Sequence, residues 1–123
     1  MSIDNQGSTA SDNCLFCKIA AGSIPADIVY QDDKVVAFRD INPQAPIHLL
    51  IIPRTHLSTI NEASATNQDV LGYLVLVAKQ LAADNGVDQS GYRLVMNCNQ
   101  DGGQTVFHIH LHLLGGRQLT RLG

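Results

Sequence analysis

Three histidines, His108, His110 and His112, occupy every second position of one short segment near the end of the chain. Strand side chains alternate between two faces, so an extended segment would place all three imidazoles on one side. Imidazole can titrate near neutral pH, attack as a neutral nucleophile or bind a metal. The run therefore indicates a functional face rather than a solvated polar strand. The apolar neighbours that we expect to pack instead are Val106, Phe107, Ile109, Leu111 and Leu113.

Two cysteines, Cys14 and Cys17, form a C-x-x-C pair, and a third, Cys98, stands apart. Taken alone, such a pair is either a redox pair or half of a metal site. An odd number of cysteines in a chain without a signal-like start does not indicate a disulfide framework. We interpret Cys98 as an ordinary buried thiol and assign it no role.

The elements that position these residues follow from apolar periodicity and turn residues. Asn13 is expected to cap the first helix and Gly22 to close it. Every strand connection is a short turn or a polar loop, so we expect an α+β fold with an antiparallel sheet and the helices on one side. The expected helices are 14–21 and 67–85, and the expected strands are 27–30, 34–38, 48–52, 92–96 and the histidine segment.

Size and charge limit the classes of protein that the chain can belong to. Its 123 residues indicate one domain, expected over 13–123, after a polar and flexible tail over 1–12. The net charge is −3 and there is no lysine-arginine block, which argues against a general nucleic-acid binder. No apolar run is long enough to cross a bilayer, and the start lacks a secretory pattern, so a cytoplasmic protein is expected.

The histidine run, with its apolar spacers, resembles the signature of the histidine triad family of nucleotide hydrolases and transferases. Two further stretches, from Phe38 to His48 with its Pro-Gln-Ala-Pro loop and from Gly102 to Arg117, are similar to the Hint branch of that family, the purine nucleoside phosphoramidases. The resemblance covers roughly residues 13–118. It implies the HIT-like fold, a five-stranded antiparallel sheet with a long and a short helix.

The resemblance also assigns roles to individual residues. His110 matches the nucleophile that attacks phosphorus, His112 matches a proton donor beside the phosphate and leaving group, and His48 matches a histidine that orients the triad. Asp40 matches the acid that accepts from both ribose hydroxyls, or it is a turn-capping residue. Asn97, Thr105 and the backbone N–H groups of 103–106 match phosphate donors. The nucleotide positions are Asn97, Gly103, Gln104, Thr105 and Val106 for phosphate, and Phe16, Ile19, Ile24, Phe38 and Ile41 for the base, although these apolar residues could equally be ordinary core.

For the C-x-x-C pair, the resemblance implies a structural zinc site completed by His56 and His108. Cys14, Cys17 and these two imidazoles make a closed tetrahedral donor set, so zinc is expected as a structural cross-link. The chemistry of His110 is expected to need no metal. The alternative is a reduced redox pair or four residues retained from a metal-binding ancestor.

The function that the resemblance favours is hydrolysis of the P–N bond in nucleoside 5′-phosphoramidates, such as adenosine phosphoramidate or AMP-lysine, through a covalent nucleotidyl-histidine. One alternative is a dinucleoside polyphosphate hydrolase or nucleotidyl transferase of the same superfamily, and another is a nucleotide-binding regulatory module with incidental turnover. The family also implies a homodimer. The wide apolar surface of the long helix agrees with this, and comprises Leu74, Val75, Leu76, Val77, Ala78 and Leu81.

Overall fold

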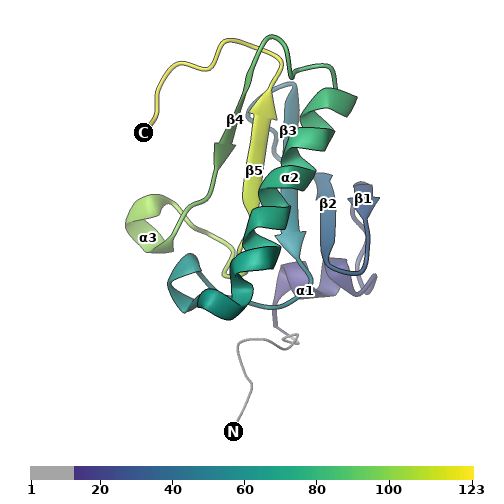
Figure 1. Ribbon diagram of the computed structural model, residues 1–123, viewed down its shortest axis with the longest axis vertical. Helices are drawn as coiled ribbons and strands as arrows, with labels where there is room; N and C mark the ends of the chain where they lie inside the picture. The colour runs from purple at the N-terminus through teal and green to yellow at the C-terminus, as the bar shows by residue number, and fades with distance from the viewer. Residues whose placement is uncertain (1–12) are drawn as a thin grey trace, which may run out of the picture.

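The computed structural model describes residues 13–123, so the tail expected over 1–12 lies outside the described residues. Five strands form one antiparallel sheet in the order β1-β2-β3-β5-β4 (Figure 1). Their bounds are Ile28–Gln31 for β1, Val35–Arg39 for β2, Ile47–Pro53 for β3, Tyr92–Val95 for β4 and Leu111–Gly115 for β5. The expected fold class is therefore confirmed.

Two helices lie on opposite faces of this sheet, which corrects the expectation that the helices share one side. The long helix α2, Gln68–Asp84, packs against one face, and the short helix α1, Leu15–Ala20, packs against the other (Figure 1). A third and shorter helix, α3, covers Asn99–Gly102, and short 3₁₀ turns cover Ile60–Glu62 and Ala65–Asn67. Within the described residues, no helix is both long enough and apolar enough to span a membrane.

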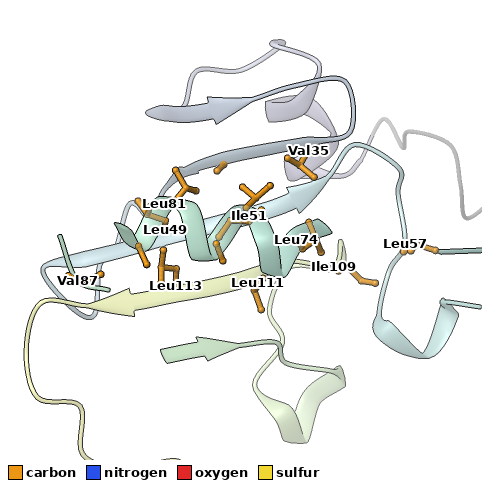
Figure 2. Close-up of a cluster of buried hydrophobic side chains, with 14 residues drawn as sticks. Val35, Leu49, Ile51, Leu57, Leu74, Leu81, Val87, Ile109, Leu111 and Leu113 are labelled. Carbon is orange, nitrogen blue, oxygen red and sulfur yellow. The ribbon is translucent and has the colours of Figure 1, made fainter. Parts of the chain in front are cut away.

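The larger core lies between α2 and the sheet (Figure 2). Leu49 and Ile51 of β3, and Leu111 and Leu113 of β5, meet Leu74 of α2 in one cluster. Removing one such side chain from water stabilises the fold by about 2 kcal/mol. Because strand side chains alternate, the residues between these leucines and isoleucines must face the side of α1. This alternation decides where His48 and His112 point.

The structure corrects two local expectations. The cap of α1 is Cys14 rather than Asn13, because the Cys14 Sγ accepts the backbone N–H of Cys17. In addition, β5 begins only at Leu111, so two of the three histidines precede the strand. The backbone turns there because Ile109 N–H donates to the Leu57 oxygen at 2.7 Å instead of continuing the ladder. Phe107, which we expected to pack, is 48% exposed.

Candidate active site

His48 and His112 meet on the face of the sheet that α2 does not cover. They lie on the neighbouring strands β3 and β5, and His48 Nε2 is 2.9 Å from His112 Nδ1. The backbone N–H of Gln44 donates to His48 Nδ1 at 3.0 Å, so the proton of the neutral ring must sit on Nε2. His48 therefore donates to His112 Nδ1, and His112 keeps its own proton on Nε2. A backbone amide thus determines the tautomer of both rings.

His110 lies just before β5 and has the opposite tautomer. Its Nδ1 is 2.7 Å from the backbone oxygen of His108, and a carbonyl oxygen can only accept, so Nδ1 carries the proton. The lone pair is therefore on Nε2. The ring is buried against Phe16, with centroids 5.1 Å apart. Burial lowers the pKa of His110, which keeps this imidazole neutral and nucleophilic.

The rings of His110 and His112 are neighbours, with centroids 5.0 Å apart. Burial, together with the neighbouring His110 and His48, lowers the pKa of His112 to about 4. Asp40 lies at the end of β2, where its Oδ2 is 3.5 Å from His48 Nε2. Its Oδ1 accepts the backbone N–H of Asn42, so Asp40 caps a turn and also faces the histidines.

Four side chains beside this site could hold a metal ion: Cys14, Cys17, His56 and His108. His108 Nε2 donates to the Pro53 oxygen at 2.8 Å, which leaves its Nδ1 as an unprotonated donor. This Nδ1 is 3.3 Å from the Cys14 sulfur, 3.5 Å from the Cys17 sulfur and 3.2 Å from His56 Nδ1. A tetrahedral zinc ion would separate two nitrogens by about 3.3 Å and a nitrogen and a sulfur by about 3.6 Å. The donor set therefore fits such an ion.

The electrostatics of this metal-binding cluster agree with that fit. Burial lowers the pKa of His108 to about 4 and also lowers the pKa of His56, so both imidazoles stay neutral, as a ligand must be. The Cys14 sulfur caps α1 and accepts the N–H of Cys17. The cluster joins α1, the segment after β3 and the segment before β5.

A second group, Asp40, His48 and His112, also brings three ligand atoms together, but it does not fit a metal. A neutral His48 bound to metal through Nε2 would need its proton on Nδ1. That atom already accepts the N–H of Gln44, so the two hydrogens would collide. The group is better described as a hydrogen-bonded set that shares protons.

The loop expected to bind phosphate lies between α3 and the histidine segment. Gly103 N–H donates to the Gln100 oxygen and Gln104 N–H donates to the Asn99 oxygen, so both amides cap α3 and are not free for a ligand. We therefore restrict the expected backbone donors to Thr105 and Val106. Gly103 has a φ of +89°, and a Cβ at this position would lie 3.9 Å from the side-chain amide nitrogen of Asn97, so the loop passes close to Asn97.

A surface cavity of about 400 Å³ opens between this loop and the metal-binding cluster. Leu15 and Phe107, both about half exposed, lie at this cavity. Its lining is Asn13, Cys14, Leu15, His56, Thr105, Val106 and Phe107.

The apolar residues expected to hold a base are only partly assembled. Phe16 and Phe38 pack edge to face at 5.3 Å in one cluster with Ile19, and Ile24 packs against it. Ile41, by contrast, is 99% exposed in the loop after β2.

Sequence reasoning missed the backbone groups that orient His48 and His108. The Gln44 amide and the Pro53 oxygen set the protons of His48 and His108, and no side-chain pattern signals a main-chain partner. It used Arg117 as a motif residue but did not predict its contact: the guanidinium donates to the Gln44 oxygen at 2.9 Å and ties the segment after β5 to the Pro-Gln-Ala-Pro loop.

Comparisons with known proteins agree with this geometry. The family model described as the HIT domain matches residues 21–119. The purine nucleoside phosphoramidase of Escherichia coli strain K12 is 53% identical over 109 residues, which cover 89% of this chain and 92% of that protein. A HIT family hydrolase from Legionella pneumophila superposes with a TM-score of 0.87 at 57% identity, covering 88% of this chain and 96% of the other. A histidine triad protein from Clostridium difficile superposes with a TM-score of 0.90 at 40% identity, covering 94% and 100%.

Proposed function

This chain belongs to the HIT domain family, and on that premise we propose that it is an enzyme that hydrolyses the P–N bond of nucleoside 5′-phosphoramidates. The supporting observation is the tautomer of His110. Its Nδ1–H is held by the His108 oxygen at 2.7 Å, which leaves Nε2 as a neutral nucleophile. The name of the E. coli relative at 53% identity supports the choice of phosphoramidates as substrates.

The proposed reaction has two steps. His110 Nε2 attacks the α-phosphorus, the P–N bond breaks, and its electrons leave with the amine, which takes up a proton. In our proposal the Nε2–H of His112, whose Nδ1 accepts from His48, gives that proton to the leaving amine. Water then attacks the nucleotidyl-histidine and gives a proton to His112 Nε2, which releases the nucleoside monophosphate and restores both histidines.

Charge on the phosphate oxygens needs preorganised donors. In our proposal these are the amides of Thr105 and Val106, the hydroxyl of Thr105 and the side chain of Asn97, with Gly103 allowing close approach. Among the described residues, neither of these two amides has a protein partner in the structure, as a ligand-binding amide requires. Gln104 would contribute indirectly, by holding this loop in position through its side chain.

For the nucleoside, we propose that Asp40 accepts from the two ribose hydroxyls through the oxygen that faces His48. Phe38 and Ile24 would line the base slot together with Phe16 and Ile19, and the exposed Ile41 would close over it when a purine binds. A side chain that is 99% exposed in the empty site has apolar surface available for such a contact.

For the metal-binding cluster, we propose zinc as a structural ion held by Cys14, Cys17, His56 and His108. Two thiolates and two neutral imidazoles are a closed structural set without an open position for substrate. When bound, zinc would supply a cross-link between α1 and the histidine segment, and the phosphorus chemistry would remain with the imidazoles.

We further propose a homodimer formed through α2 and the edge of the sheet. Val75 and Leu76 on α2 are 47% and 60% exposed, which is unusual for adjacent large apolar residues. Within residues 13–123, the strand β4 lies at one edge of the sheet and has a neighbour only on the side of β5. A second copy could continue the sheet there and cover the exposed face of α2.

One set of assays separates this proposal from the alternatives. Purified protein is incubated with AMP-lysine and, separately, with diadenosine polyphosphates, and AMP release is followed for wild type and His110→Ala. Turnover of AMP-lysine that disappears in His110→Ala, with AMP binding retained, supports the phosphoramidase. Preferred cleavage of the dinucleotide supports the polyphosphate hydrolase, and AMP binding without turnover of either substrate supports a regulatory module.

A further inference from the structure

The buried side-chain amide of Gln104 joins three separate segments of the chain. Its Oε1 accepts the backbone N–H of Asn99 at 2.8 Å. Its Nε2 donates to the Ser58 oxygen at 2.8 Å and to the Val106 oxygen at 3.0 Å. Only 5% of the residue is exposed. Both donors and the acceptor are therefore used, and the amide can hold only one orientation.

Each of these segments belongs to one part of the site. Ser58 follows the metal-ligand candidate His56 by two positions. Val106 lies in the phosphate loop, and Asn99 follows the phosphate-donor candidate Asn97 by two positions. The segment after β3 is also tied to the histidine segment, because Ile109 N–H donates to the Leu57 oxygen.

Asn99 shows that this arrangement is under constraint. Its φ is +61°, a left-handed conformation that costs free energy in a residue with a side chain. The bond from its N–H to Gln104 Oε1 is in a position to hold that conformation. Losing a buried amide partner leaves the N–H of Asn99 and the oxygens of Ser58 and Val106 unsatisfied, which favours movement of the loop.

We propose that Gln104 is a positioning residue that couples the metal-binding cluster to phosphate binding. It need not touch the nucleotide. It holds the amides of Thr105 and Val106 where a phosphate can meet them, and it links them through Ser58 to the segment that carries His56. This inference rests on the proposed function. Coupling between two ligands is reciprocal, so zinc should tighten AMP and AMP should tighten zinc by the same factor.

The first test compares AMP with adenosine, which lacks the phosphate, on zinc-bound protein by calorimetry. Gln104→Leu removes all three bonds at similar volume, and Gln104→Glu keeps the acceptor but loses both donors. Gln100→Leu is the matched control on an exposed position of α3. We expect both Gln104 variants to weaken AMP about tenfold and adenosine less than twofold, because misplaced amides cost a charge-assisted contact only where phosphate binds. Equal loss of AMP and adenosine would overturn the proposal.

The second test measures the coupling itself. The ratio of AMP affinities with and without Zn²⁺ is compared between wild type and Gln104→Leu. We expect a ratio well above one for wild type and close to one for the variant. A wild-type chain that binds no Zn²⁺, or a variant that keeps the wild-type ratio, would overturn the coupling.

Amide hydrogen exchange tests whether Gln104 positions the loop, and this test does not depend on the proposed function. If wild type binds no AMP, the proposed function fails, whereas the role of Gln104 is still decided by exchange at Thr105 and Val106. We expect faster exchange there in Gln104→Leu, with exchange in α2 unchanged. Unchanged exchange at both amides would show that Gln104 does not position the loop.

Discussion

The backbone oxygen of His108 accepts the Nδ1–H of His110 at 2.7 Å, while the side chain of His108 faces the two thiols of the metal-binding cluster. One residue thus contributes its imidazole to the cluster and its carbonyl to the proposed nucleophile. Both groups belong to one fully buried residue, so a backbone shift at His108 moves its ring and its carbonyl together. The cluster and the reactive imidazole are therefore mechanically connected.

Metal removal should consequently lower both stability and turnover. We expect a purified chain to contain about one zinc per protomer, and chelation to lower the melting temperature by 10 °C or more, since structural zinc contributes directly to folding. Cys14→Ala with Cys17→Ala should reproduce the loss, whereas Cys98→Ala should not. Elemental analysis and thermal unfolding provide the measurements. A metal-free wild type of full stability would contradict the structural zinc.

Replacement of His48 should separate its two hydrogen bonds. Asn at position 48 can mimic Nδ1 and keep the bond from the Gln44 amide, whereas Gln can mimic Nε2 and keep the bond to His112. We expect His48→Asn to lower kcat about 10- to 100-fold, because the proton on His112 is then no longer directed to Nε2. His48→Gln should retain more activity.

Steady-state kinetics on AMP-lysine measure this difference, with Gln44→Ala as a control that keeps the backbone amide. Equal activity of His48→Asn and wild type would remove His48 from the mechanism.

Acid should destabilise the protein through His112. Burial lowers its pKa from 6.5 to about 4, so between these values the unfolded chain binds more protons than the folded one. The free energy of unfolding therefore falls as pH decreases from about 6.5 to about 4, by about 2 kcal/mol for this partly exposed ring. Urea unfolding across that range should show a shallower dependence for His112→Asn. The same slope in both proteins would mean that the pKa of His112 is not lowered.

The sequence predicted most helices and strands because the apolar side chains that reveal the periodicity are the same ones that are buried in the core. The apolar run in 48–52 and the spacing of Leu74, Ala78 and Leu81 describe surfaces that are in fact buried. It failed where one particular contact decided where an element begins. The sulfur of Cys14, rather than Asn13, caps α1. The N–H of Ile109 bonds to the Leu57 oxygen, and β5 begins only after His110.

Within the site, residue types indicated the chemistry but not the proton positions. The spacing of the histidines brought His110 and His112 together as expected. Which nitrogen carries each proton depends on the Gln44 amide and the His108 oxygen. Almost every residue has a backbone amide and a carbonyl, so the sequence does not single out these two. Only the folded structure shows where they meet an imidazole.

A charge on the exposed surface of α2 should test the homodimer. We expect Leu76→Glu to convert a dimer to a monomer, because burying an unpaired carboxylate in an apolar interface costs several kcal/mol. Leu15→Glu places the same charge on α1, where the side chain is 47% exposed, and should leave the assembly unchanged. Sedimentation analysis of the three proteins decides this. A monomeric wild type, or a dimeric Leu76→Glu, would contradict an interface at this surface.

Gly116 should tolerate no side chain, because it supports the loop that orients His48. A Cβ there would lie 2.9 Å from the Cβ of Pro46, and its φ is +93°. Gly116→Ala should therefore combine backbone strain with a clash, costing about 2–3 kcal/mol of stability, and should lower kcat by displacing the Gln44 amide. Gly22→Ala is the matched control, since its φ is +77° but nothing lies within 4 Å of the added carbon. Chemical denaturation and kinetics on AMP-lysine should show only the strain, about 1 kcal/mol, in Gly22→Ala. If both variants lost stability equally and kept full activity, the contact between Gly116 and Pro46 would have no part in placing His48.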